Sequence, residues 1–160
     1  MGVSQWREQW SEQEWFTLRL GPVWVLSALV GRIRFDEDER GAFWDAVTDA
    51  ALRSTGPGRD LLGTAAAERL WLFDEFELDG RPVVSGLFSV TGLLERMDPD
   101  TRTDVRSSFL RVGVGVALAR GHFGRRMTLE DEQTLVLVEQ LLQTTRETLD
   151  DNPLNSAATI

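Results

Sequence analysis

The sequence contains no cysteine and no tyrosine, and it has a single histidine, His122. The lack of cysteine excludes a disulfide framework, a thiolate nucleophile, an iron–sulfur cluster and a cysteine-ligated zinc site. One histidine excludes a site with several histidine ligands and leaves one imidazole for a Ser/His/Asp arrangement. A metal bound here would therefore be a hard cation with oxygen ligands.

The sequence also lacks an excess of basic residues and a long apolar run. It has 17 Lys and Arg against 26 Asp and Glu, a net charge of −9, and such a chain repels phosphate backbones. The apolar runs 23–30 and 112–119 are far shorter than the roughly 20 residues that span a bilayer. The first residues have neither a cationic region nor an apolar one. We expect no nucleic-acid partner, no membrane insertion, no signal peptide and a cytoplasmic location.

The apolar pattern predicts an all-α, single-domain helical bundle. With 160 residues, of which 42% are hydrophobic, the chain suits one core. Capping residues predict helices that begin near Ser11, Asp36, Asp98 and Thr128. Further helices are expected over 23–33, 61–76 and 82–97, separated by Gly- and Pro-containing loops. Strand is only a minor alternative, at 112–116, where β-branched residues gather.

The chain divides into three parts by composition. Residues 1–10 form a tryptophan-rich N-terminal arm, residues 11–143 form the all-α domain, and residues 144–160 form a polar helix end and tail. In the arm, Trp6 and Trp10 are candidates for partner binding, since exposed tryptophan is favoured at interaction hot spots. The equal alternative is an arm packed on its own domain. Three further tryptophans, Trp24, Trp44 and Trp71, are expected in the core.

Two stretches, 26–39 and 116–132, share one order of features. Each has an apolar helix with small residues, a short Gly/Arg loop, a hydrophobic residue and an acidic helix start. In this the sequence resembles the tellurite-resistance TerB-like family, which has two related helical halves. The resemblance implies a stress-response setting and a metal site that maps onto Glu39 and Glu132. However, Val30-Gly31 and Arg120-Gly121 stand where the family has Asp-Gly, and Arg120 would repel a cation.

The acidic helix starts supply the candidate metal ligands Asp36, Glu39, Glu130 and Glu132. They could complete the coordination of a divalent cation with water, as in a cation sensor or a metal-dependent hydrolase. The favoured interpretation is that these acids cap helices and complement the helix dipole. His122 is expected in an exposed loop, and the acidic run 74–79 is expected to be a solvated helix end. Gly113 and Gly115 are expected to allow close helix packing.

No nucleophile, base or cofactor loop is assembled in the sequence, so no catalytic residue and no cofactor are predicted. The favoured function is a non-catalytic binding or scaffold module, with a protein partner or self-association. The first alternative is the divalent-cation site described above. The second is an apolar small ligand bound between helices, which the wholly apolar run 23–30 would allow.

Overall fold

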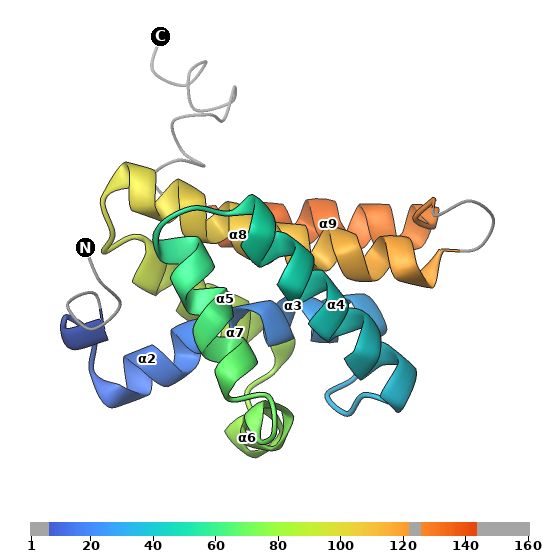
Figure 1. Ribbon diagram of the computed structural model, residues 1–160, viewed down its shortest axis with the longest axis horizontal. Coiled ribbons are helices and arrows are strands. Elements are labelled where there is room, and N and C mark those ends of the chain that lie inside the picture. Colours follow the sequence, from blue (N-terminus) through green and yellow to red (C-terminus); the bar gives the residue numbers. More distant parts are fainter. Residues whose placement is uncertain (1–6, 122–125, 144–160) are drawn as a thin grey trace, which may run out of the picture.

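The computed structural model describes residues 7–121 and 126–143, and this part of the chain is all-α (Figure 1). It contains eight helices and no strand, as the apolar pattern predicts. No helix in this part is long and apolar enough to cross a membrane. In chain order the helices are α2 (Glu12–Arg19), α3 (Gly21–Val30), α4 (Glu37–Arg53), α5 (Pro57–Ala67), α6 (Leu72–Asp79), α7 (Val83–Leu94), α8 (Pro99–Arg120) and α9 (Leu129–Leu142).

The apolar helix α3 lies at the centre of the bundle. Eight of its ten residues are buried, and it packs against α7, α8 and α9. The longest helix, α8, also packs against α4, α5 and α9. In Figure 1, α4 and α5 lie in front of α8, and α9 runs beside α8. A helix that is apolar on all sides is stable only when other helices enclose it, which explains the central place of α3.

Four helices begin where capping residues predicted. The side chains of Ser11, Asp36, Asp98 and Thr128 each accept a hydrogen bond from the backbone N–H three residues later. Such a bond satisfies one of the N–H groups that have no partner within the helix. The four predicted helix starts are thus confirmed. Capping can be predicted from sequence because it involves only residues close together along the chain.

The glycines of α8 allow neighbouring helices to approach closely. A Cβ atom at Gly113 would lie 2.7 Å from Val25 Cγ1 and 2.8 Å from Leu135 Cδ2. A Cβ atom at Gly115 would lie 2.8 Å from the Cβ of Ala46. These distances are too short for real contacts, so the predicted packing role of both glycines is confirmed.

The prediction of one helix over 61–76 is wrong, because the helix is interrupted between α5 and α6. Both Glu68 in the break and Glu75 in α6 pair with Arg19 of α2, whose side chain is buried. Residues seven apart in a continuous helix lie about 10 Å apart along its axis. One guanidinium pairs with both carboxylates here because the turn brings them together.

One of the three tryptophans expected in the core is half exposed. Trp71, at the start of α6, has 49% of its surface exposed. Trp24 is buried as expected, and Trp44 is partly buried against the core. The periodicity of apolar residues therefore predicted too large a core.

Candidate functional site

The first acidic junction lies between α3 and α4. Helix α3 ends at Gly31, whose φ of 80° is a left-handed conformation that glycine adopts readily. Asp36 and Glu39 form a reciprocal capping box. The N–H of Glu39 donates to Asp36 Oδ1 at 2.8 Å, and the N–H of Asp36 donates to Glu39 Oε1 at 2.9 Å. Two candidate metal ligands are thus brought together as the N-terminal cap of α4.

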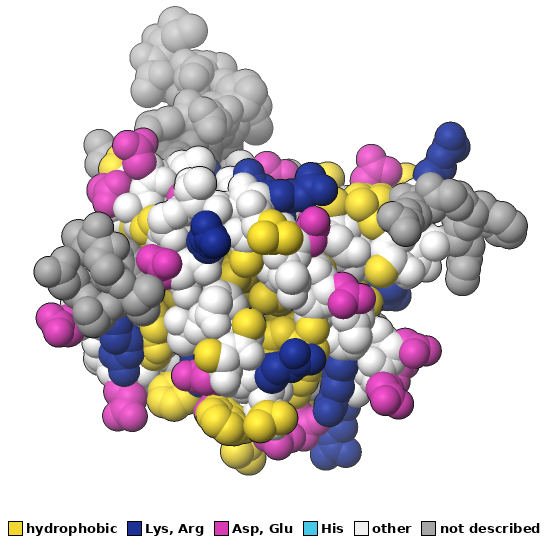
Figure 2. Space-filling model, in the orientation of Figure 1, with side chains coloured by type: hydrophobic (Ala, Val, Ile, Leu, Met, Phe, Trp, Pro, Cys, Tyr) yellow, Lys and Arg dark blue, Asp and Glu magenta, His cyan; other side chains and the backbone are white. Residues whose placement is uncertain are grey.

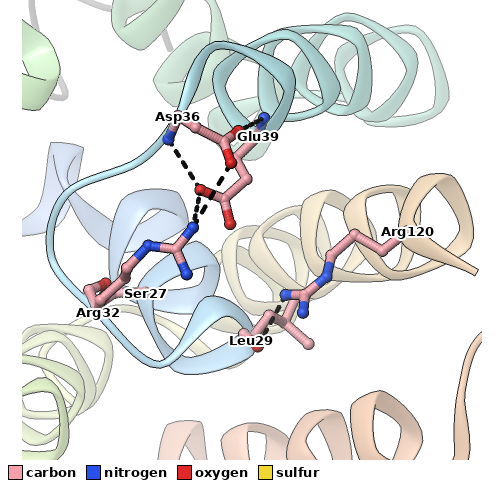
Figure 3. A network of polar contacts seen from close by, with 6 residues as sticks. All are labelled: Ser27, Leu29, Arg32, Asp36, Glu39 and Arg120. Atoms are coloured by element: carbon pink, nitrogen blue, oxygen red, sulfur yellow. Dashed lines mark hydrogen bonds and ion pairs between the residues drawn. The ribbon is translucent and has the colours of Figure 1, made fainter.

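Arg32 pairs with both carboxylates of this junction. Its Nη2 lies 2.5 Å from Glu39 Oε1 and 3.7 Å from Asp36 Oδ2 (Figure 3). The Ser27 hydroxyl donates to the carbonyl of Arg32 at 2.7 Å, which fixes the loop to the last turn of α3. The guanidinium carries its charge at every physiological pH. It therefore balances one of the two carboxylate charges of this junction.

The second junction repeats this arrangement with Arg120. Arg120 is the last residue of α8; its Nη1 donates to the carbonyl of Leu29 in α3 at 2.8 Å, and its Nε lies 3.8 Å from Asp131 Oδ2. Asp131 is buried, and its N–H donates to the Thr128 hydroxyl that caps α9. Figure 3 shows that Arg120 reaches Leu29 near the C-terminal end of α3, whereas the guanidinium of Arg32 turns toward Asp36 and Glu39. Positive charge there also complements the helix dipole.

The residue equivalent to Glu39 in the second junction is Asp131. Glu39 is the third residue after the cap Asp36, and Asp131 is the third residue after the cap Thr128. Sequence reasoning chose the neighbours Glu130 and Glu132, which are exposed on the first turn of α9. Counting from the capping residue in both halves is the signal that would have found Asp131.

The candidate metal ligands do not gather in one cluster in the part of the chain that the structure describes. Within residues 7–121 and 126–143, no three histidine, cysteine, aspartate or glutamate side chains are placed so that they could hold a metal ion. Asp36 and Glu39 contact Arg32 and the backbone of α4, while Glu130 and Glu132 do not join them in a cluster. His122 lies outside the described residues. In the described chain, Asp36 and Glu39 cap α4 and pair with Arg32.

Three acids of the run 74–79 pair with arginines. Glu75 pairs with Arg19, and Glu77 lies 3.8 Å from Arg34. Asp79 accepts two hydrogen bonds from Arg81, both 2.7 Å long, which lower the pKa of the Asp79 carboxyl. All 17 basic residues of the chain are arginine, which binds carboxylates through two nitrogens more readily than lysine. Among these pairs, the one between Glu75 and Arg19 joins α6 to α2.

Of the two tryptophans predicted to bind a partner, the structure describes only Trp10. Trp10 has 5% of its surface exposed, and the guanidinium of Arg96 lies 4.9 Å from its ring centroid. Trp10 therefore packs on its own domain, as the alternative predicts, and the prediction that it is exposed is wrong. Trp6 lies outside the described residues.

Large apolar side chains are exposed instead at α6. Leu70 and Leu78 have 84% and 85% of their surface exposed, and Trp71 has 49%. Trp71, Asp74 and Leu78 are spaced by three and four residues and so lie on one face of the helix. We call these residues, Leu70, Trp71, Asp74 and Leu78, the α6 surface. Figure 2 shows hydrophobic side chains gathered over α6, at the bottom of the view.

No protein-family model, no curated protein and no solved structure matches this chain. The relationship to the TerB-like family therefore stays a prediction, and function has to be argued from the geometry described above.

Proposed function

We propose that this protein is a non-catalytic protein-binding module that docks its partner on the α6 surface. The observation that carries the proposal is the exposure of Leu70, Trp71 and Leu78 within nine residues of a well-packed domain. Isolated exposed apolar residues are common, but a contiguous group of large ones marks an interaction site. Tryptophan is moreover among the residues that contribute most binding energy at interfaces.

Local sequence preferences support a functional reason for Trp71. It occupies the N-cap of α6, where it makes no side-chain capping bond. Serine, threonine, aspartate or asparagine at an N-cap typically adds about 1 kcal/mol of stability. At this position Trp71 neither caps the helix nor buries its ring fully, so it adds little to the stability of the free protein. Departures from local preference of this kind are expected at functional sites.

The α6 surface also indicates the chemistry of its partner. Asp74 is exposed between Trp71 and Leu78, and it has no ion pair among the described residues. The helix rise of 1.5 Å per residue places Trp71 and Leu78 about 10 Å apart. A complementary segment would carry apolar side chains on either side of a lysine or arginine. An anionic partner would be repelled by Asp74 and by the net charge of −9 on the whole chain.

A displayed peptide library can test this proposal directly. The chain has no lysine, so an amine-reactive linker couples at the N-terminal amine and leaves α6 uncovered. Peptides selected on the wild type are counter-selected on the Leu70→Ser/Leu78→Ser variant. We expect enriched peptides that combine apolar and basic residues, with affinity at least tenfold lower for the variant. The matched control Leu52→Ser/Leu129→Ser, at residues 76% and 69% exposed, should bind as the wild type does.

Two results would contradict the proposal. One is a selection in which no peptide distinguishes the wild type from the Leu70→Ser/Leu78→Ser variant. The other is equal loss of binding in the control variant, which would indicate nonspecific apolar adhesion. Because both leucines are mostly exposed, the variant should lose less than about 1 kcal/mol of stability, and thermal unfolding verifies that it is folded.

The two arginine-closed junctions support a TerB-like pair of helical halves as the scaffold of this module. Each junction combines an N-cap, an acid three residues later and an arginine that reaches the end of α3 or its loop. The stress-response setting implied by the resemblance is part of the same proposal.

A further inference from the structure

The outer face of α7 carries no charge and exposes two large apolar side chains. None of the twelve residues of α7 is charged. Gly86, Leu87, Val90, Thr91 and Leu94 form its buried face, whereas Val84 and Phe88, one turn apart, are 52% and 58% exposed. An exposed phenylalanine on an uncharged helix is typical of an interface rather than of a solvated surface.

The neighbouring helix α9 extends this apolar face. The Thr91 hydroxyl donates to the carbonyl of Leu141 at 2.5 Å, which joins α7 to α9. Phe88 lies one turn before Thr91 in α7, and Leu137 lies one turn before Leu141 in α9. Leu137 is 59% exposed, which is close to the exposure of Phe88. Large exposed apolar side chains thus lie on both helices next to the contact that joins them.

We propose that this face binds the same face of a second copy of the chain. Two copies that each carry a net charge of −9 repel one another, and a charged interface would add to that repulsion. The outer face of α7 contributes no like charges to such a contact, and it offers a charged partner no counter-charge. Symmetric dimers are the commonest oligomers, and their interfaces are apolar and depleted of charge.

The spacing of α7 fits an antiparallel pair across a two-fold axis. Val84 and Gly92 lie four residues on either side of Phe88 in the sequence. In a pair centred on Phe88, Val84 of each copy therefore faces Gly92 of the other. Gly92 is exposed, and a Cβ atom there would meet nothing within 4 Å, so there is open space for the valine. Large residues opposite small ones let two helices approach closely.

Sedimentation velocity on the whole chain, over a range of concentrations, tests this inference. We expect the wild type to reach twice the 18.0 kDa chain mass, and Phe88→Glu to remain at 18.0 kDa. The control Leu52→Glu, on α4, should form the dimer as the wild type does. A sharper arm mixes Phe88→Glu with Phe88→Arg: each alone should be monomeric, while the mixture should recover the dimer because opposite charges meet at the axis.

Several outcomes would overturn the inference. They are a wild type that stays at 18.0 kDa at all concentrations, a Phe88→Glu variant that still dimerises, and a charge-paired mixture that remains monomeric. Thermal unfolding of the Phe88 variants shows whether they are folded. The peptide selected on the α6 surface should bind Phe88→Glu as tightly as it binds the wild type, so failure of the dimer and failure of the proposed function give different results.

Discussion

Replacing Arg120 with methionine tests whether this residue acts as an internal cation. The substitution keeps an apolar stem but removes the donor to the buried Leu29 carbonyl, 2.8 Å away, and the charge 3.8 Å from Asp131. A buried carbonyl without a donor costs about 1–3 kcal/mol. A buried charge that loses its partner costs about 3–5 kcal/mol when the pair is close, and less at this distance. We expect a loss of about 3 kcal/mol.

The matched control is Arg32→Met in the first junction. The Arg32 side chain is 52% exposed, so its ion pair with Glu39 contributes about 0–1 kcal/mol. Urea unfolding followed by tryptophan fluorescence gives both free energies by linear extrapolation. At about 2–4 °C per kcal/mol, Arg120→Met should also lower the melting temperature by roughly 6–12 °C.

A double variant separates the charge from the packing. Arg120→Met/Asp131→Asn removes both charged groups, so it should be more stable than Arg120→Met by about 0.5–3 kcal/mol. The reasoning is refuted if Arg120→Met loses no more stability than Arg32→Met. It is also refuted if the Asp131→Asn substitution brings no recovery, since Asp131 would then not depend on the arginine.

Two further predictions concern packing and pH. Gly86→Ala should lower the free energy of unfolding by about 1–3 kcal/mol, because its Cβ would lie 2.5 Å from the buried Trp24 ring. The control Gly63→Ala, whose Cβ would meet nothing within 4 Å, should raise it by up to about 1 kcal/mol. Urea unfolding measures both values, and equal effects would contradict the close approach of Gly86 to Trp24. Hydrogen bonds from Arg81 lower the pKa of Asp79 in the folded state below its ordinary 3.8, so this carboxylate stabilises the fold above that pH and the effect fades as pH falls through the folded pKa. Asp79→Asn should therefore be less stable than the wild type at pH 7, and this difference in stability should shrink as the pH falls below 3.8; a difference that widens on acidification would contradict the reasoning.

The elements that the sequence predicts well are those set by neighbours along the chain. Asp36 and Glu39 form their capping box within one turn, and Ser11 does the same at α2. The break between α5 and α6 has no glycine or proline signal, and Arg19, which pairs with Glu68 and Glu75 there, comes from a distant part of the sequence. Local patterns therefore predict where helices start better than how long they continue.

The candidate site shows a similar division. The sequence correctly placed Asp36 and Glu39 at a helix start, but it did not reveal the arginine that reaches them. The contacts of Arg120 form only in the folded chain, where this residue of α8 reaches both α3 and α9. Apolar periodicity likewise could not separate Trp71, which is exposed, from Trp24, which is buried. Both look the same in a pattern that records only hydrophobicity.

The most direct test of the account is thermal unfolding in the presence of divalent cations. The account holds that arginine closes both acidic junctions and that the protein binds a protein partner rather than a metal ion. Tryptophan fluorescence should then give the same melting temperature with Mg²⁺, Ca²⁺, Mn²⁺ or Zn²⁺ added singly as with EDTA. A site saturated at 100 times its Kd would add about 2.7 kcal/mol. A saturable rise of that size, removed by Glu39→Gln or Asp131→Asn, would contradict the account and identify a metal site.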